Sequence, residues 1–422
     1  MNHFELLGGE LRCEDVPLTA IAEAVGTPVY VYSSATLARH YTVLRDALTT
    51  AGVADPLIAF AVKANSNVAV LRTLAQLGAG ADVVSEGEVR RALAAGVPPE
   101  RIVFSGVGKS EPEIAFALQA GVAEINVESE AELRLVDAVA QRLGTRAQVA
   151  IRVNPDVEAG GHAKISTGKA ENKFGVSLSE AERLYANASN MAGVIPVGVA
   201  CHIGSQITDL APMEAAFTKM RALVERLRAE GMSVRRLDLG GGLGVPYFNQ
   251  PTPPAPDVYA AMVARVTLGL DVALAFEPGR MIAANAGVLL SRVIHIHERP
   301  EGRRFLVLDA AMNDLIRPAM YDAYHDIRPV RPREGQAQAY DVVGPICETG
   351  DTFTRDRVLP PLAAGDLVAF MTAGAYGAVM SSEYNSRLLA PEVLVRGADW
   401  AVVRPRPTYD DMLAREQPAP WL

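Results

Sequence analysis

The sequence predicts a parallel (β/α)8 barrel, of the kind called a TIM-type barrel, joined to a mostly antiparallel β domain. Between about residues 57 and 285, eight short apolar runs alternate with amphipathic stretches rich in Ala and Leu, which is typical of βα units. Eight such units favour a closed barrel over an open doubly wound sheet, which usually has about five or six parallel strands. After Asn285 the helical stretches give way to strand-like runs punctuated by Gly and Pro.

Each element is predicted from its own apolar run. The barrel strands are expected at Leu57–Val62, Ala81–Val84, Arg101–Phe104, Glu124–Val127, Gln148–Val153, Val197–His202, Arg236–Leu239 and Val272–Phe276. Strands of the β domain are expected at Val288–His297, Arg304–Leu308, Tyr340–Val343 and Leu367–Phe370, and we expect Val29–Tyr32 to join them. We therefore place the barrel at residues 36–285 and a β-sandwich-like or β-barrel-like domain at residues 1–35 and 286–422.

Composition excludes several classes of protein. The 422 residues carry a formal net charge of −9, and the local basic cluster Arg328, Arg331 and Arg333 is interrupted by Pro, so a nucleic-acid surface is not expected. No apolar run approaches the ~18 residues of a membrane span, and we expect a cytoplasmic protein. Three scattered cysteines suit neither a disulfide framework nor a zinc site. His295 and His297 share a strand face without a nearby third ligand, so no metal is expected.

Chemistry-bearing side chains follow the predicted barrel strands, where the active sites of such barrels lie. Lys63 stands where the first strand meets the barrel mouth, a position suited to an amine that forms a Schiff base, although a surface lysine capping the strand fits as well. Gly240–Gly242 follow the seventh strand and could present backbone N–H groups to a phosphate.

The loops after the sixth and eighth strands add further groups. His202 could stack on an aromatic cofactor while Ser205 binds a phosphate oxygen; a satisfied core histidine is the alternative. Glu277 could hold the ring nitrogen of pyridoxal phosphate, and Arg280 could bind a substrate carboxylate, unless the two form a structural ion pair. Together with Lys63 and the glycines, these residues describe a site for pyridoxal 5'-phosphate on a barrel.

Motifs along nearly the whole chain resemble those of the fold type III pyridoxal phosphate-dependent decarboxylases, and within them the branch that acts on diaminopimelate. The motifs that carry the resemblance are Phe60–Asn65, His162–Gly175, His202–Gln206, Gly240–Gly242, Glu277–Arg280, Met312–Tyr321, Cys347–Asp351 and Gly374–Asn385.

The resemblance implies a role for each residue of the cofactor site. Lys63 would bind the cofactor covalently and act with His202 and Cys347 as a catalytic residue. His202 would stack on the ring and Glu277 would face its nitrogen. The phosphate would be held by Ser205, Gly241, Gly242, Tyr376 and the backbone at Gly279 and Arg280.

The resemblance also implies the substrate and the partner. Arg280, Arg317 and Tyr321 would bind the distal carboxylate of meso-2,6-diaminopimelate and Glu348 its distal ammonium, and Tyr376 would also contact the substrate. Cys347 would protonate the carbon that loses CO2. The product would be L-lysine. Cys347 and Glu348 would come from the second subunit of a homodimer with shared active sites.

Three alternatives remain beside this interpretation. A sibling decarboxylase would act on ornithine, arginine or carboxynorspermidine, although ornithine and arginine have no distal carboxylate for Arg317 to bind. An alanine racemase on the same barrel characteristically places an arginine, not Glu277, at the ring nitrogen. A noncatalytic regulator or vitamin carrier would not need both Lys63 and Cys347.

Overall fold

The computed structural model describes residues 2–158, 173–247 and 251–421. The chain divides into two compact units. One unit spans Ala38–Pro246 and continues from Pro251 to Ile282, and the other holds the residues up to Leu37, Tyr247 and the chain from Ala283 onward.

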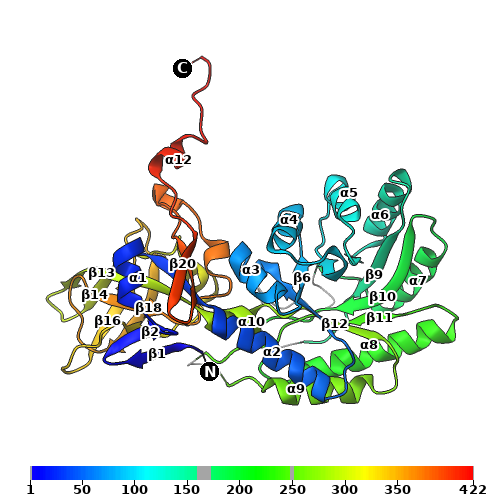
Figure 1. Cartoon of the computed structure of the whole chain (residues 1–422), viewed down its shortest axis with the longest axis horizontal. Helices are drawn as coiled ribbons and strands as arrows, with labels where there is room; N and C mark the ends of the chain where they lie inside the picture. The colour runs from blue at the N-terminus through cyan, green and yellow to red at the C-terminus, as the bar shows by residue number, and fades with distance from the viewer. Residues whose placement is uncertain (1, 159–172, 248–250, 422) are drawn as a thin grey trace. The chain divides into compact units, whose positions relative to one another are not determined.

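The first unit is a closed barrel of eight parallel strands, which confirms the predicted fold class (Figure 1). Its neighbouring pairs are all parallel, and β12 closes the ring by pairing with β5. Each predicted run overlaps one of these strands: β5 (Leu57–Ala61), β6 (Gly80–Val83), β7 (Ile102–Phe104), β8 (Glu124–Val127), β9 (Ala147–Val153), β10 (Val194–Cys201), β11 (Arg236–Asp238) and β12 (Ala273–Phe276).

Helices follow the strands and lie outside them in Figure 1. They are α2 (Ser34–Thr50), which precedes β5, and α3 (Val68–Ala75), α4 (Glu86–Ala95), α5 (Glu111–Ala120), α6 (Glu130–Arg142), α7 (Leu178–Ser189), α8 (Ala211–Ala229) and α9 (Pro256–Thr267).

Four of these helices begin at the same local sequence, Ser-x-x-Glu. The N-cap residues of α4, α5, α6 and α7 are Ser85, Ser110, Ser129 and Ser177, each with Glu three positions later. In α4, α6 and α7 the serine oxygen accepts a hydrogen bond from the backbone N–H of that glutamate, and in α5 the serine and the glutamate form a reciprocal capping box. These caps fix where each loop from a strand turns into its helix, and so they position the residues at the strand ends.

The second unit contains a nine-stranded mixed sheet in which antiparallel pairs predominate, as predicted. Its main path runs β17-β16-β14-β13-β4-β19-β20; β18 pairs with β13, and β15 pairs with β18. Only the pairs β14–β16 and β19–β4 are parallel. The strands are β4 (Val29–Ser33), β13 (Gly287–Glu298), β14 (Arg304–Leu308), β15 (Ile327–Pro329), β16 (Gln338–Val343), β17 (Thr352–Leu359), β18 (Leu367–Phe370), β19 (Glu392–Arg396) and β20 (Asp399–Arg404).

The N-terminal segment belongs to this unit. β4 pairs with β13 and β19, which confirms the prediction for Val29–Tyr32. A small sheet of β1 (Phe4–Leu7), β2 (Glu10–Cys13) and β3 (Val16–Pro17) precedes α1 (Leu18–Val25), and α11 (Arg317–Tyr321) and α12 (Tyr409–Leu413) follow later. Leu11, Cys13 and Ile21 pack with Val31 and Val288 in one buried cluster.

None of the helices in the described residues has the length and apolar character needed to cross a membrane. The same residues contain no group of His, Cys, Asp and Glu side chains arranged to hold a metal ion.

Candidate active site

Lys63 is ion-paired inside the barrel mouth. It lies in a 3-10 turn, Val62–Ala64, that follows β5 directly. Its Nζ donates to Asp82 Oδ2 at 2.8 Å, and the Asp82 side chain on β6 is fully buried. Lys63 itself is 38% exposed. A buried carboxylate therefore holds the amine in one place, while part of the lysine side chain stays accessible.

Glu277 directly follows β12 and is hydrogen-bonded by one residue after β7 and one on β8. Its Oε1 accepts a hydrogen bond from Ser105 Oγ at 3.3 Å and one from Asn126 Nδ2 at 3.5 Å. Asn126 also donates to Ser105 Oγ, at 3.1 Å. Burial raises the pKa of Glu277 well above its ordinary value, and the nearby carboxyl groups of Asp238 and Asp82 raise it further. The environment of Glu277 therefore favours the protonated form of its carboxyl group.

Ser205 and Arg280 are hydrogen-bonded to each other. The Ser205 hydroxyl accepts from Arg280 Nε at 3.3 Å and from Arg280 Nη2 at 3.1 Å. Arg280 is buried and begins the short helix α10 (Arg280–Ala283). The loops after β10 and β12 therefore place a hydroxyl and a guanidinium side by side.

His202 is oriented by the glycine loop. Its Nδ1 accepts a hydrogen bond from the backbone N–H of Gly241 at 3.2 Å. Burial lowers the pKa of His202 well below its usual value, and the cations Lys63 and Arg152 lower it further. The imidazole is therefore neutral, with its proton on Nε2, and adds no charge to the site.

The glycines after β11 are required by packing. A Cβ on Gly241 would lie 2.2 Å from the backbone oxygen of Glu277, and one on Gly240 would lie 2.3 Å from that of Cys201. Gly240 and Gly242 also have φ values of +65° and +112°, which L side chains rarely adopt. The chain can approach its neighbours this closely only with glycine here.

A buried charge network beside these residues was not predicted from the sequence. Glu128 accepts from Arg152 Nη1 at 2.9 Å and from the backbone N–H groups of Gly106 and Gly175. The fully buried ammonium of Lys109 donates to Glu132 Oε1 at 2.8 Å. Arg152, a charged residue inside the apolar strand β9, was the available signal for this network.

Some predicted residues lie in the other unit, where they form their own contacts. Arg317 is buried in α11 and donates from Nη1 to Tyr247 Oη at 3.2 Å and to His325 Nε2 at 2.9 Å. His325 Nδ1 lies 3.0 Å from the backbone oxygen of Met371, so Nδ1 carries the proton and Nε2 accepts from Arg317. Sequence reasoning missed both Tyr247 and His325.

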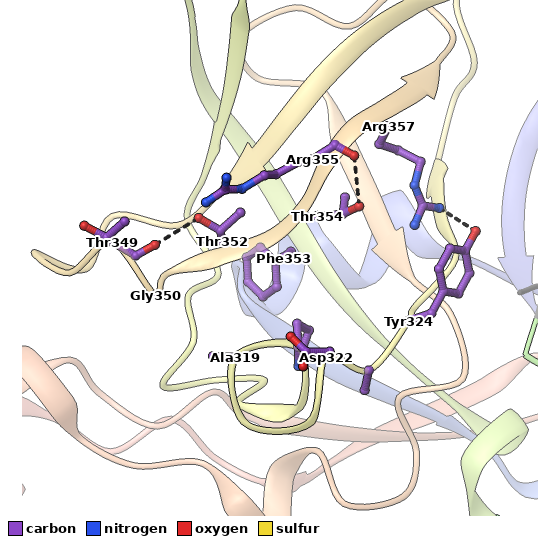
Figure 2. A pocket seen from close by; sticks show the side chains of 12 residues that line it. Ala319, Asp322, Tyr324, Thr349, Gly350, Thr352, Phe353, Thr354, Arg355 and Arg357 are labelled. Carbon is purple, nitrogen blue, oxygen red and sulfur yellow. Dashed lines mark hydrogen bonds between the residues drawn. The ribbon is translucent and has the colours of Figure 1, made fainter. Parts of the chain in front are cut away.

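Cys347 and Glu348 lie on an exposed turn before β17. The backbone N–H of Cys347 donates to Asn385 Oδ1 at 3.2 Å, and Glu348 Oε2 accepts from Tyr384 Oη at 2.9 Å. The same turn borders a hollow of about 470 Å3 that β17 and the residues after α11 also line, among them Gly350, Arg355 and Tyr324 (Figure 2). Arg357 Nη1 closes one side of this hollow by donating to Tyr324 Oη at 2.7 Å.

The remaining predicted residues are placed as follows. Tyr376 adopts a φ of +56° between two glycines, and a Cβ on the first of them, Gly374, would lie 2.1 Å from the backbone oxygen of Ala283. Tyr321 is the last residue of α11, and Gly279 directly precedes α10. In the predicted motif at 162–175, residues 162–172 lie outside the described part of the chain.

Comparison with known proteins decides the family. Residues 35–284 match the family model for the pyridoxal binding domain of pyridoxal-dependent decarboxylases. The chain belongs to the pyridoxal-dependent decarboxylases. This decarboxylase is 50% identical to the diaminopimelate decarboxylase of Zymomonas mobilis, over 100% of both chains. It is 51% identical to that of Pseudomonas aeruginosa, also over 100% of both.

Solved structures of similar proteins have the same fold. The diaminopimelate decarboxylase of M. jannaschii superposes on this decarboxylase with a TM-score of 0.95 at 37% identity, covering 100% of this chain and 99% of its own. That of Helicobacter pylori, complexed with L-lysine, has a TM-score of 0.90 at 41% identity, covering 94% of this chain and 98% of its own.

Proposed function

We propose that this decarboxylase removes CO2 from meso-2,6-diaminopimelate and releases L-lysine, as the last step of a lysine biosynthetic route. The proposal depends on one observation: the barrel strands place three groups at their ends, the ion-paired amine of Lys63, the neutral imidazole of His202 and the carboxyl group of Glu277, whose pKa is raised. Full-length relatives named diaminopimelate decarboxylase support the choice of substrate.

The barrel residues fit pyridoxal phosphate. Lys63 supplies the amine for its aldehyde, and Glu277 a buried carboxyl group for its ring nitrogen. The cofactor supplies an electron sink for the carbon that loses CO2. His202 offers the face of an uncharged ring for stacking, and because the ring is neutral it adds no charge beside the cofactor.

The proposed phosphate site consists mainly of backbone and small side chains that a phosphate group can reach. We assign it to Ser205, Gly241 and Gly242, the backbone at Gly279 and Arg280, and Tyr376. Backbone N–H groups and hydroxyls bind phosphate oxygens well where no side chain blocks their approach. The close packing at Gly241 leaves no room for a side chain at that position.

The substrate's distal end meets opposite charges in this assignment. Arg280, Arg317 and Tyr321 bind the distal carboxylate, and Glu348 binds the distal ammonium. Arg317 suits this role because Tyr247 and His325 hold its guanidinium in a buried position. A fixed guanidinium binds a carboxylate with bidentate geometry, and ornithine and arginine lack that carboxylate.

Cys347 is the proposed proton donor, and its exposure argues for a partner. It lies uncovered on its turn beside Glu348, whereas proton transfer to a carbon needs a site from which water is excluded. We therefore propose a homodimer in which each Cys347 and Glu348 complete the active site of the other subunit. We propose no nucleic-acid partner for this decarboxylase.

We place the reaction in the cytoplasm. Cys13, Cys201 and Cys347, the three cysteines of the sequence, are all free thiols. Free thiols persist in reducing compartments.

The direct test is product detection by mass spectrometry. The cofactor-loaded protein is incubated separately with meso-diaminopimelate, ornithine, arginine and carboxynorspermidine. We expect L-lysine from diaminopimelate, none in Lys63→Ala, and normal amounts in Lys219→Ala, whose amine bonds to the backbone oxygens of Pro155 and Asp156. Turnover of another substrate alone would assign a sibling activity.

A subunit-mixing experiment tests the shared sites. We expect Lys63→Ala and Cys347→Ala each to be inactive, whereas a mixed dimer would have one site with both residues intact. Co-refolding equal amounts should restore up to about a quarter of wild-type activity, as expected for random pairing in a twofold assembly. No recovery in a mixture shown to contain mixed dimers would place Lys63 and Cys347 of one chain in the same site.

A further inference from the structure

The hydroxyl of Tyr384 holds one oxygen of the Glu348 carboxylate. Tyr384 Oη donates to Glu348 Oε2 at 2.9 Å, and this hydrogen bond raises the pKa of Tyr384 because the carboxylate stabilises the protonated phenol. The phenol therefore remains a donor at neutral pH. Both side chains are exposed, so core packing does not force this contact.

The other oxygen of Glu348 lies over Gly350. A Cβ on Gly350 would lie 3.0 Å from Oε1, closer than ordinary van der Waals contact. Because residue 350 has no side chain, Oε1 can take this position without a clash. Oε1 receives no hydrogen bond from the residues that the structure describes, whereas Oε2 is bound by the phenol. The two oxygens of this carboxylate are therefore in different surroundings.

The backbone on both sides of Glu348 is also held by hydrogen bonds. The N–H of Cys347 donates to Asn385 Oδ1 at 3.2 Å. On the side of the hollow, Thr352 Oγ1 donates to the backbone oxygen of Thr349 at 3.1 Å (Figure 2). With its backbone held in this way, Glu348 keeps mainly the rotations of its own side chain, and the phenol restricts these.

The phenol and the Asn385 amide reach this turn from a strained segment. They belong to the 3-10 turn Tyr384–Ser386, in which Asn385 and Ser386 have φ values of +57° and +54°. Left-handed backbone is uncommon for residues other than glycine, and it persists where the surrounding structure enforces it, often at functional sites. The first two side chains of this segment bond to Glu348 and to the backbone of Cys347, the residues that the proposed function places in the active site.

We propose that Tyr384 is a positioning residue for substrate specificity: it holds Oε2 of Glu348 so that Oε1 accepts the distal ammonium of diaminopimelate. This inference rests on the assignment of Glu348 to that ammonium in the proposed function. A carboxylate that is already held in place loses less side-chain freedom when the ammonium binds, so binding is strengthened at that end of the substrate alone.

The test compares two substrates that differ only at the distal end. 2-Aminopimelate, with the same configuration at the reacting carbon, has the distal carboxylate of diaminopimelate but no distal ammonium. In cofactor-loaded Tyr384→Phe, KM for diaminopimelate should rise about 3- to 10-fold with kcat nearly unchanged, whereas KM for 2-aminopimelate should stay the same. If 2-aminopimelate is not turned over, its inhibition constant against diaminopimelate replaces its KM.

The control is Tyr409→Phe, which removes the hydroxyl of another exposed tyrosine, on α12, and should change neither constant. Equal rises for both substrates in Tyr384→Phe would mean that the phenol only supports the turn, and this result would overturn the inference. An unchanged KM for diaminopimelate would overturn it as well.

A second measurement reports the contact without turnover. In protein labelled with 3-fluorotyrosine, the fluorine resonance of Tyr384 is the one missing from Tyr384→Phe. It should titrate at lower pH in Glu348→Gln than in the wild type, because an amide does not favour the protonated phenol as a carboxylate does. Cys347, the other titratable group that acts on Tyr384, is the same in both proteins.

The two measurements separate the failure of this inference from the failure of the proposed function. Titration of Tyr384 at the same pH in the wild type and in Glu348→Gln would overturn the inference whatever the substrate. If the wild type releases no lysine from diaminopimelate although the two titrations differ, the contact exists but the proposed function fails, and the specificity role of Tyr384 fails with it.

Discussion

The amine of Lys63 lies 2.8 Å from a carboxylate oxygen of Asp82, whose side chain is completely buried in the barrel. The lysine side chain is partly exposed, and this contact with a buried carboxylate helps to fix the position of its nitrogen. Asp82→Asn removes the charge at nearly constant volume and should lower kcat by about 10- to 100-fold, as expected when a hydrogen bond to a charged group is lost at a reacting centre.

Steady-state kinetics and the visible absorbance of the bound cofactor check this prediction together. The cofactor should still bind, because the amine remains. An unchanged kcat with normal cofactor content would show that Asp82 has no part in orienting Lys63.

Arg317 should depend on His325 for its position. His325 accepts from its guanidinium at 2.9 Å and is itself anchored to Met371. His325→Leu leaves the guanidinium without this acceptor, so KM for diaminopimelate should rise about 10-fold, corresponding to about 1.4 kcal/mol, with a smaller effect on kcat. Tyr247→Phe keeps the ring on which Arg317 stacks and should have a weaker effect. A fall in kcat at constant KM would contradict a binding role.

Lys109 and Glu132 form a buried ion pair that should matter for stability. The Lys109 side chain is 1% exposed and its ammonium bonds to Glu132 and to the backbone oxygens of Gly106 and Asn126. Lys109→Met leaves an uncompensated buried carboxylate and should cost about 3–5 kcal/mol in the free energy of unfolding. Adding Glu132→Gln should recover part of this loss. Denaturant unfolding of the two single variants and the double variant measures the coupling, and strict additivity would contradict it.

Gly241 should not accept even one methyl group. The Cβ of Gly241→Ala would lie 2.2 Å from the backbone oxygen of Glu277, and backbone atoms cannot move aside as side chains can. We expect at least a 10-fold weaker affinity for pyridoxal phosphate, since both the loop and Glu277 would shift. Gly108→Ala is the control, because nothing lies within 4 Å of its Cβ. Equal cofactor affinity in the two variants would show that the loop tolerates the displacement.

Periodicity predicted the barrel well because short, mainly apolar runs alternate regularly with amphipathic helical stretches. Strands such as β17 and β20 were not predicted, since polar residues interrupt them; in β17, Arg355, Asp356 and Arg357 follow one another. Pairing in the sheet also depends on contacts distant in sequence, such as that of β4 with β19. The N-terminal helix α1 lacks a side-chain cap and so carries no start signal of the Ser-x-x-Glu type.

Residues of the site that follow a strand were easier to predict than residues inside one. Lys63, His202 and Glu277 stand at strand ends, which is where the active sites of such barrels lie. Asp82, Asn126 and Asp238 lie within β6, β8 and β11, and their contacts depend on which side chains point into the barrel. Periodicity along a three- or four-residue strand is too short to settle that direction.

Glu124 offers a test of which effect dominates in a buried ion pair. Its Oε2 accepts from Arg236 Nη1 at 2.9 Å, which favours the charged form, yet burial prevails and raises its pKa to about 7. The folded protein therefore binds more protons at this site than the unfolded chain between about pH 4.5 and 7, so the free energy of unfolding falls as pH rises through that window. Glu124→Gln should remove this slope.

The two proteins should have similar stability near pH 5, where Glu124 is protonated. Above about pH 7 the variant should be the more stable by up to about 3 kcal/mol, the linkage value for a shift of this size. Urea unfolding at several pH values measures the difference, with the exposed Glu225→Gln as control. A variant less stable than the wild type above pH 7 would mean that the Arg236 ion pair outweighs the cost of burying the charge.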